Sequence, residues 1–373
     1  MTLRALEFYS GIGGLHLALT RSTVDARVVQ AFDWDQNACQ IYDANTPSRL
    51  VKKVDIATLT AQCLSALRAD LWLLSPACQP YTILNPNPLG AADPRAKSFL
   101  HLIQTVLPEL HSTNSAPSFL LIENVAGFET STTRQILKTT LQDLNYYIAE
   151  LLLTPLQFGI PNSRLRYYLL ARKSSFPSDH GGTEQEVRRQ LPGYKHTLDT
   201  RGLELEAEQR KQSENEINEI SQYLDPPELS SPSLRIPDKV LRKWGRLFDI
   251  VLPTSRRTCC FTRGYTQLVE RAGSILQMNQ DLDTTSTFDE FTALEAQDGP
   301  EAVRLLDKLQ LRYFSPDELL RIFAFNELGQ TPAFHWPENI SSKTKYRLIG
   351  NSVNVKVVEM LVRYLFDVPY YAD

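Results

Sequence analysis

Short apolar runs alternate with helical patterns over the first 172 residues of the chain. The runs are rich in Leu, Ile, Val and aromatic residues, which is typical of strands. The expected strands are Leu3–Tyr9, Arg27–Phe32, Leu71–Leu74, Phe119–Ile122, Ile148–Leu153 and Tyr167–Leu170, and the expected helices cover 35–45, 95–108 and 131–143. Because strands alternate with helices, the pattern favours an α/β fold with a mainly parallel, doubly wound sheet.

The pattern changes after residue 173. Residues 174–237 are polar and charged, and indicate a linker with helical pieces that could be mobile. Residues 238–312 are expected to form a smaller inserted domain, and residues 1–173 plus 313–373 the main domain. The run Ser315–Glu318 marks a capped helix start, and a last helix over about 353–366 is expected to pack on the main domain.

Composition favours a soluble enzyme inside the cell. The 373 residues, 42% of them hydrophobic, suffice for a large core and two domains. No apolar run approaches the ~20 residues that span a bilayer, and the first residues enter a strand rather than a cleavable signal. We therefore expect a cytoplasmic or nuclear protein, or both, without a membrane partner. Its cysteines lack a C-x-x-C pair and should stay reduced: Cys39, Cys63, Cys78, Cys259 and Cys260.

The formal net charge of −4 argues against a protein that coats nucleic acid indiscriminately. It leaves room for local basic faces. Basic residues gather in two places, namely Arg256, Arg257, Arg263 and Arg271, and then Lys343, Lys345, Arg347 and Lys356. Each cluster is either an ordinary solvated surface or a contact for nucleic acid.

A glycine turn follows the first expected strand. Gly11, Gly13 and Gly14 open a helix, so backbone amides can approach a ligand closely. Asp33 lies 22 residues after Gly11, at the end of the next strand, where a carboxylate can accept hydrogen bonds from ribose hydroxyls. The pair predicts a nucleoside-containing cofactor. A tight turn without ligand is the alternative, and the G-x-G-G spacing differs from the G-x-G-x-x-G of dehydrogenases.

Cys78 lies on a proline-flanked loop, SPACQP, directly after the apolar run Leu71–Leu74. A thiol held at a strand end is suited to act as a nucleophile, although free cysteine more often packs as a small hydrophobe. Glu123 directly follows the strand FLLI, while Arg164 and Arg166 alternate at a strand start and so point to one side. These groups could hold a base and favour the thiolate. A capping glutamate and a solvated basic edge are the alternatives.

Seven fragments together resemble the cytosine-5 methyltransferases, and most closely their tRNA-methylating branch, the DNA methyltransferase 2 homologues. They are FYSGIGG, SPACQPYT, LIENVAGFE, FGIPNSRLRYYLLAR, CCFTRGYT, LRYFSPDELLRI and YRLIGNSVNVKVV. The CFT run at 260–262, followed by Arg263, Gly264 and Tyr265, is the most branch-specific of them. The resemblance implies a Rossmann-like methyltransferase fold in which 238–312 is the target-recognition domain.

The resemblance also implies the reaction. S-adenosylmethionine would donate the methyl group and leave as S-adenosylhomocysteine, cytosine 38 of tRNA-Asp would accept it, and no metal would be needed. Cys78 would attack C6, Glu123 would contact N3 and N4, and Arg164 and Arg166 would fix the flipped nucleotide. Implied cofactor contacts are Ser10, Gly11, Ile12, Gly13, Gly14, Leu15, Asp33, Trp34, Asp55, Ile56, Asn351, Ser352 and Val353, and implied substrate contacts are Arg257, Arg263 and Tyr265. Trp34 could instead be ordinary packing, and Asn351–Ser352 a helix cap.

The resemblance of CFTRGYT to the tRNA-methylating branch favours an RNA substrate over duplex DNA. A base also leaves an anticodon loop more cheaply than a duplex. A DNA cytosine-5 methyltransferase is the first alternative. A catalytically silent tRNA-binding protein is the second, because Ala77 stands where many relatives carry a proline. In addition, Ile83, Leu84 and Asn85 follow Thr82 where many relatives carry a T-R-x-G pattern. A nucleotide-dependent oxidoreductase fits only the glycine turn. A monomer is expected.

Overall fold

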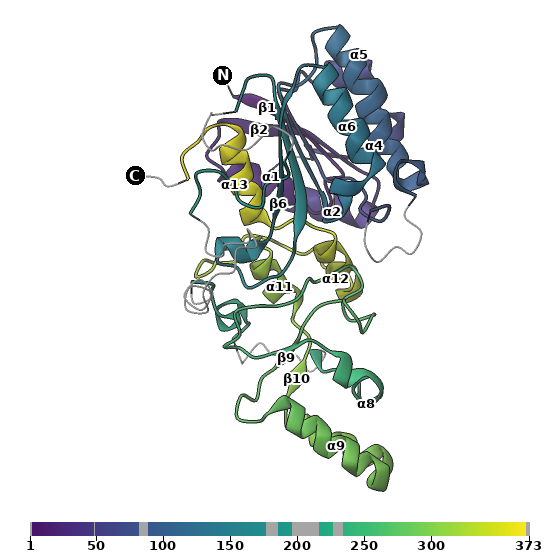
Figure 1. Ribbon diagram of the computed structural model, residues 1–373, viewed down its shortest axis with the longest axis vertical. Helices are drawn as coiled ribbons and strands as arrows, with labels where there is room; N and C mark the ends of the chain where they lie inside the picture. The colour runs from purple at the N-terminus through teal and green to yellow at the C-terminus, as the bar shows by residue number, and fades with distance from the viewer. Residues whose placement is uncertain are drawn as a thin grey trace.

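The computed structural model describes residues 2–47, 49–81, 89–176, 186–195, 216–226 and 234–370, with the side chains of 296–300 left out. A large α/β body forms one end of the molecule and a smaller lobe forms the other, with α11 (Pro316–Ile322) and α12 (Ser342–Gly350) between them (Figure 1). No helix in these ranges is both long and apolar enough to cross a membrane.

Seven strands form the main sheet in the order β3-β2-β1-β4-β5-β7-β6. They are β1 Leu3–Phe8, β2 Ala26–Asp33, β3 Val51–Lys53, β4 Leu71–Leu74, β5 Phe119–Val125, β6 Tyr147–Leu153 and β7 Arg166–Arg172. Only β7 runs antiparallel to its neighbours, so the expected mainly parallel sheet is confirmed. The edge strand β3 is not among the expected strands, because its sequence VKK contains a single apolar residue.

The strand order reverses between β1 and β4, since β2 and β3 extend the sheet to one side and β5 to the other. Phe8 at the end of β1 pairs with Phe32 and with Leu74, and Leu74 pairs with Ile122. The carboxyl ends of these strands therefore meet at one edge. In open α/β sheets, such a reversal point is where ligands bind.

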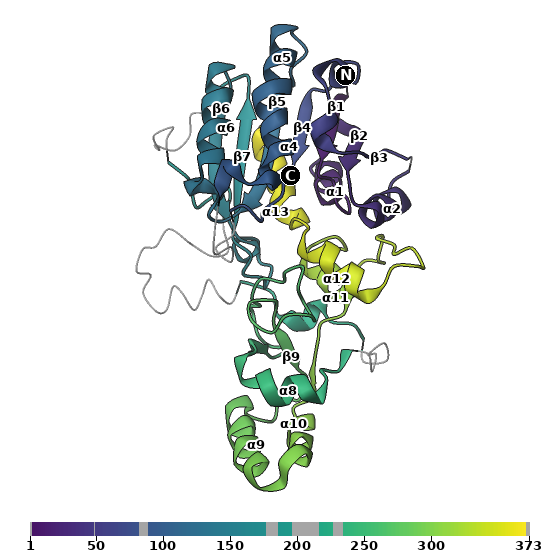
Figure 2. The ribbon, with the colours of Figure 1, turned by 90° about the vertical axis from the view of Figure 1, so that its right-hand side faces the viewer.

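Helices cover both faces of the sheet, as the doubly wound prediction requires (Figures 1 and 2). On one face α4 (Lys97–His101), α5 (Leu107–Ser112) and α6 (Thr132–Asp143) share a core with Phe8 and Trp72. On the other face α1 (Gly14–Arg21) and α13 (Val355–Leu365) share a core with Ala5 and Leu73. Adjacent residues of a strand thus enter opposite cores.

The predicted helices are largely confirmed. Helix α2 spans Gln36–Ala44 and α6 spans Thr132–Asp143, whereas the helix expected over 95–108 is interrupted by a π-helical turn at Leu102–Val106. The capped start at Ser315 is also confirmed, because its side chain accepts the Glu318 N–H while the Glu318 carboxylate accepts the Ser315 N–H at 2.8 Å. Helix α13 lies within the range expected for the last helix.

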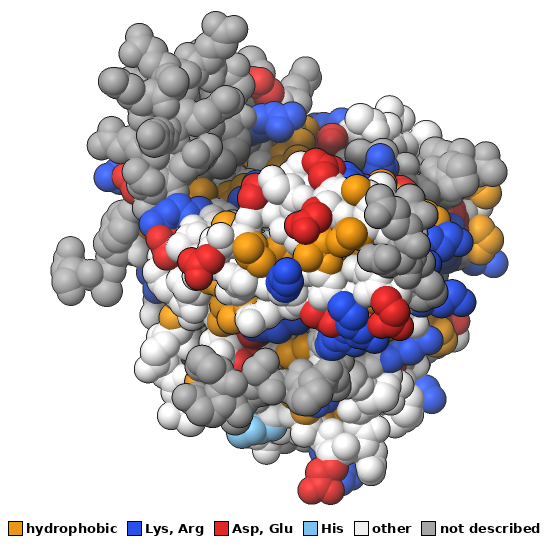
Figure 3. Space-filling view, turned by 90° about the horizontal axis from the view of Figure 1, so that it is seen from below, with side chains coloured by type: hydrophobic (Ala, Val, Ile, Leu, Met, Phe, Trp, Pro, Cys, Tyr) orange, Lys and Arg blue, Asp and Glu red, His pale blue; other side chains and the backbone are white. Residues whose placement is uncertain are grey.

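The small lobe contains a three-stranded sheet and helices. Its elements are β8 Ile250–Val251, β9 Ile275–Gln277, β10 Leu311–Arg312, α8 Asp238–Trp244, α9 Thr284–Asp298 and α10 Arg304–Asp307. Ile275, Phe288 and Leu306 belong to a core of its own, whereas Phe261 and Tyr265 pack into the main core. The proposed domain of 238–312 thus shares part of its packing with the main body. Seen from below, its surface mixes basic and acidic side chains (Figure 3).

The described parts of the proposed linker are packed. Leu191, Ile220 and Tyr223 are buried in the main core, and the Leu152 N–H donates to the Arg188 carbonyl at 2.8 Å. Residues 186–195 and 216–226 are therefore part of the folded body and not a free spacer. The remaining stretches of the linker proposal, 177–185, 196–215 and 227–233, lie outside the described residues.

Candidate active site

A cavity of about 480 Å³ opens where the main sheet reverses, and residues from both ends of the chain line it. All four expected catalytic side chains are among its walls, namely Cys78, Glu123, Arg164 and Arg166. So are the expected ligand contacts Ser10, Gly11, Ile12, Gly14, Leu15, Asp33, Trp34, Arg263, Asn351, Ser352 and Val353. The folded chain thus brings most of the candidate residues to one place.

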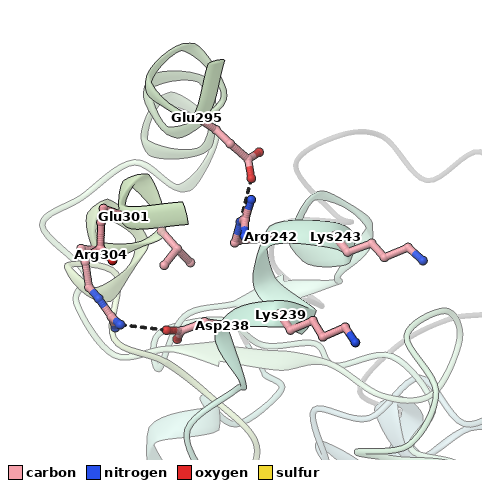
Figure 4. A pocket seen from close by; sticks show the side chains of 8 residues that line it. Asp238, Lys239, Arg242, Lys243, Glu295, Glu301 and Arg304 are labelled. Carbon is pink, nitrogen blue, oxygen red and sulfur yellow. Dashed lines mark hydrogen bonds and ion pairs between the residues drawn. The ribbon is translucent and has the colours of Figure 1, made fainter. Parts of the chain in front are cut away.

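A larger cavity, of about 610 Å³, lies in the small lobe between α8, α9 and α10 (Figure 4). Ion pairs cross it, with Arg242 2.8 Å from Glu295 and Arg304 3.1 Å from Asp238. Among the wall residues that the structure describes there, none is a cysteine or a histidine. Because four of its charged wall residues pair with one another and none of the expected catalytic residues lines it, we assign the chemistry to the smaller cavity.

The loop that carries Cys78 is fixed to the strands on both sides of it. The Ser75 N–H donates to the Phe8 carbonyl at 3.3 Å and the Ser75 hydroxyl to the Tyr9 carbonyl at 3.1 Å. From β5, the Asn124 amide donates to the Pro76 carbonyl at 3.3 Å. The loop is thereby held in place although Ala77 removes a proline. The altered positions Ile83, Leu84 and Asn85 lie outside the described residues.

The Cys78 thiol lies among opposing charges. Burial raises its pKa above the ordinary value, and Glu123 adds to the rise, whereas the positive charges of Arg166 and Arg164 oppose it. The thiol therefore keeps its proton more firmly than a free cysteine does. A further positive charge or a proton acceptor in the cavity would favour the reactive thiolate.

Glu123 is a buried carboxyl group on β5. Burial raises its pKa, and Arg166 and Arg164 act in the opposite direction. Its Oε1 lies 3.5 Å from the Arg166 Nε. Burial favours the protonated carboxyl group and the nearby arginines favour the carboxylate. Because the two effects oppose each other, Glu123 is suited to exchange a proton with a ligand.

The two arginines face the cavity but have different partners. Arg164 is 3% exposed, and its guanidinium donates to the carbonyls of Phe261 at 3.0 Å, Gly350 at 3.1 Å and Ser352 at 2.6 Å. These bonds join three distant segments. The expectation that both arginines fix the substrate stays a prediction: the two Nη atoms of Arg164 bond to the protein itself, whereas its buried Nε has no hydrogen-bond partner among the described residues. Arg166, the first residue of β7, lies beside Glu123 instead.

Cys260 is a site residue to which the sequence motif assigned no role. Its sulfur lies 3.5 Å from Nη1 of Arg164 and 3.6 Å from Nη2 of Arg166. Burial acts to raise its pKa, but the two arginines outweigh burial and the pKa lies below the ordinary value. Cys260 is not a wall of the cavity, whereas Cys78 is. Cys78 is thus the thiol placed to meet a ligand, and Cys260 orients the arginines.

The glycine turn is tied to Asp33. The Gly11 N–H donates to Oδ2 of Asp33 at 2.8 Å, and the Asp35 N–H donates to Oδ1 at 2.8 Å. Gly11 has a φ of 52° and Gly13 of 88°, a left-handed backbone that glycine adopts readily. Gly13 does not line the cavity, because it faces the ring of Tyr42. Each oxygen of Asp33 keeps a lone pair that a ligand hydroxyl can use.

Asp55 and Ile56 are the other expected cofactor contacts that the structure does not place in the cavity. Asp55 is exposed and caps the 3-10 helix Ile56–Thr58, accepting the Ala57 N–H at 2.9 Å. Its short side chain is used for this local cap.

Two expected substrate contacts also have other roles. Arg257 forms an ion pair with Asp249 at 3.0 Å and does not line the cavity. Tyr265 is 2% exposed, and its hydroxyl donates to the Ser274 carbonyl and accepts the Phe314 N–H, both at 2.9 Å. The expected stacking of Tyr265 on a base is wrong in this structure, because neighbouring aromatic rings enclose it.

The end of the chain closes the cavity at its rim. Arg347 of α12 pairs with Asp35, the N-cap residue of α2, at 2.6 Å. Trp34 is 76% exposed at the cavity wall, which excludes ordinary core packing for its ring. Sequence reasoning missed several walls, notably Tyr9, Asp35, Arg95, Ser98 and Arg347. Tyr9 and Arg347 lie within the fragments FYSGIGG and YRLIGNSVN, but the fragments assigned them no role.

Known proteins resemble this chain over almost its whole length. Residues 3–367 match the family described as C-5 cytosine-specific DNA methylase. A Schizosaccharomyces pombe protein named tRNA (cytosine(38)-C(5))-methyltransferase is 40% identical, over 98% of this chain and 97% of its own. A Dictyostelium discoideum protein named DNA (cytosine-5)-methyltransferase is 34% identical, over 97% and 94%. The crystal structure of the S. pombe Dnmt2 methyltransferase superimposes with a TM-score of 0.76 at 37% identity, covering 98% of both chains. The chain therefore belongs to the C-5 cytosine-specific DNA methylases, among the Dnmt2 homologues.

Proposed function

We propose that this protein transfers the methyl group of S-adenosylmethionine to C5 of cytosine 38 in the anticodon loop of tRNA-Asp. The observation that carries the proposal is a single cavity that joins the glycine turn at Gly11 to Cys78, Glu123 and Arg166. A donor and an acceptor base can meet only if both sites open into one space. The name of the S. pombe relative supports tRNA as the acceptor.

The cofactor half of the cavity fits an S-adenosyl group. Within the described residues, the Ser10 hydroxyl is buried without a hydrogen-bond partner, so it is available to a polar ligand group. Asp33 keeps lone pairs for ribose hydroxyls, and the exposed ring of Trp34 offers a stacking surface for adenine. When bound, S-adenosylmethionine would supply the electrophilic methyl group and a positive charge near the thiol.

The acceptor half is built for covalent catalysis. The Cys78 sulfur adds to C6 of cytosine and forms a carbon–sulfur bond, which moves electron density to C5. Glu123 donates a hydrogen bond to N3 and accepts one from the N4 amine, so that the ring can accept this density. C5 would then take the methyl group, whose bond to the cofactor sulfur breaks to leave S-adenosylhomocysteine. Loss of the C5 proton to water then expels the Cys78 sulfur and restores the aromatic ring. Arg166 stabilises the thiolate and keeps Glu123 in place.

Methylation of DNA is the second candidate, and the name of the D. discoideum relative favours it. We place RNA first because a loop base is released at lower cost than a paired one. A silent tRNA-binding protein is less well supported, since Cys78 is present and its loop is held by Ser75 and Asn124. A monomer in the cytoplasm, the nucleus or both completes the proposal.

Transfer of labelled methyl from S-adenosylmethionine tests the proposal. The acceptors are tRNA-Asp transcripts with cytosine or uracil at position 38, and a DNA duplex. We expect labelling only of the cytosine transcript, loss of labelling in Cys78→Ala, and full labelling in the control Cys63→Ala, since Cys63 is exposed. Preferential labelling of the duplex would establish the DNA alternative. Binding of tRNA and cofactor without labelling would establish the silent one.

A further inference from the structure

The buried carboxyl group of Glu7 lies beneath the glycine turn and takes no part in the proposed chemistry. Glu7 belongs to β1 and is fully buried. Its Oε1 accepts the His16 backbone N–H at 3.3 Å and its Oε2 accepts the Tyr42 hydroxyl at 2.7 Å. The same hydroxyl lies 2.8 Å from the His16 Nδ1. Glu7, Tyr42 and His16 thus form a closed set of hydrogen bonds from β1, α2 and α1.

Helix α1 has no cap of its own. Its N-cap residue is Gly13, which has no side chain to accept the first amides of the helix. The Glu7 carboxyl accepts from the backbone N–H groups of Leu15 and His16, the second and third residues of α1. An N-cap side chain normally serves these two positions. Glu7 therefore caps α1 from the preceding strand.

The same residues support the underside of the turn. A Cβ atom at Gly13 would lie 3.2 Å from Cδ2 of Tyr42, so the tyrosine ring packs directly against the turn. Ser10, Gly11 and Gly14 face the cavity from the turn's other side. Glu7 and Tyr42 hold the turn from below, while a ligand would contact it from above.

We propose that Glu7 is a positioning residue for the S-adenosyl ligand, which caps α1 and, together with Tyr42 and His16, keeps the glycine turn in its ligand-binding shape. The inference rests on the proposed function, because it takes an S-adenosyl group as the occupant of the turn.

The hydrogen bonds of Glu7 can run in two directions. When Glu7 is ionised, Nδ1–H of His16 donates to Tyr42, and Tyr42 donates to Glu7. When Glu7 is protonated, it donates to the tyrosine oxygen, and Tyr42 donates to His16 Nδ1. Burial raises the pKa of Glu7 to about 8, the Tyr42 and His16 bonds oppose the rise, and the charge of Asp33 on β2 adds to it. Burial lowers the pKa of His16 to about 4, which keeps its ring neutral.

The test is calorimetric titration of S-adenosylhomocysteine into the full-length protein between pH 6.5 and 9.5. Glu7→Gln imitates the protonated carboxyl, because its carbonyl can accept the amide and its NH₂ can donate to Tyr42. Glu7→Leu keeps the volume and removes the cap, and Tyr42→Phe removes one hydroxyl. Glu150→Gln is the matched control, since Glu150 is a buried glutamate of the same sheet that is paired with Arg134 and Lys138.

At pH 7 we expect Glu7→Gln and Glu150→Gln to bind like the wild type, and Glu7→Leu to bind roughly three- to thirtyfold more weakly, the usual cost of a lost cap. The affinity of Tyr42→Phe for S-adenosylhomocysteine should lie between those of Glu7→Gln and Glu7→Leu. If Glu7→Leu does not fold, Tyr42→Phe serves as the test variant. The affinity of the wild type should change as pH passes through about 8, while that of Glu7→Gln stays constant.

Equal affinity of folded Glu7→Leu, Tyr42→Phe and wild type would overturn the inference alone. If the wild type bound no S-adenosylhomocysteine, the proposed cofactor would be wrong, and the inference would fall with it. The two failures are therefore distinguishable.

Discussion

Arg164 donates to the Ser352 carbonyl at 2.6 Å, although the two residues lie 188 positions apart. The same guanidinium reaches Phe261 and Gly350, so one side chain ties the approach to β7, the CFT segment and the chain after α12 together. This buried joint sets the position of the walls on one side of the cavity.

Arg164→Lys should destabilise the protein, because one ammonium group cannot reach all three carbonyls and leaves buried acceptors unsatisfied. We expect the free energy of unfolding in urea to fall by about 2–4 kcal/mol. The matched control is Arg257→Lys on the surface, whose ion pair contributes at most about 1 kcal/mol. A stability equal to that of the wild type would show that Arg164 does not act as a joint.

The Cys78 thiol should react slowly with iodoacetamide at neutral pH, because burial raises its pKa. The rate of this alkylation, followed by mass spectrometry of the Cys78 peptide, should continue to increase with pH beyond about pH 9. Glu123→Gln should move this profile to lower pH, since it removes a negative charge, and Arg166→Gln should move it to higher pH. Shifts in the opposite directions would contradict the proposed charge arrangement.

Cys260→Ser should reduce turnover without preventing cofactor binding. Serine keeps the shape but not the sulfur that contacts Arg164 and Arg166, so the arginines lose part of their fixed orientation. We expect kcat to fall roughly tenfold, the effect of one misplaced charged group, with the affinity for S-adenosylhomocysteine nearly unchanged. Cys259→Ser is the neighbouring control. An unchanged kcat would limit Cys260 to a packing role.

Gly350→Ala should separate α12 from the CFT segment. A Cβ atom at this position would overlap the backbone of Thr262 and Arg263, which cannot move aside as a side chain can. We expect a loss of about 1–3 kcal/mol in unfolding free energy, and weaker cofactor binding because α12 carries cavity walls. Ser342→Ala, at the exposed start of the same helix, should change neither quantity. If Gly350→Ala had the unfolding free energy and cofactor affinity of the wild type, the CFT segment would be able to move aside without loss of stability.

The local parts of this picture could be predicted from the sequence. Cys78 and Glu123 follow or end short apolar runs, and strand periodicity alone places both at one edge of a parallel sheet. What could not be predicted depends on packing between distant segments. Arg164 and Arg166 look equivalent in RLR, and only the approach of Phe261, Gly350 and Ser352 makes Arg164 a joint.

Tyr265 illustrates the same limit. Its position between arginine and a polar run favours an exposed stacking ring, yet tertiary contacts bury it among Phe261, Tyr313 and Tyr346. The strands β8 and β10 are two residues long, too short for any periodicity to be visible. Tyr9 lies within FYSGIGG, but the sequence does not predict its place in the cavity wall, where its backbone has a φ of 58°.

The cavity is completed by Ser10 near one end of the chain and by Asn351 near the other. During synthesis on a ribosome the glycine turn emerges early, but its opposite wall leaves the exit tunnel only when translation is almost finished. A half-made chain therefore lacks the wall that Asn351, Ser352 and Val353 supply. A product of premature termination before α12 would keep the glycine turn and lack the residues that face it from the other end of the chain.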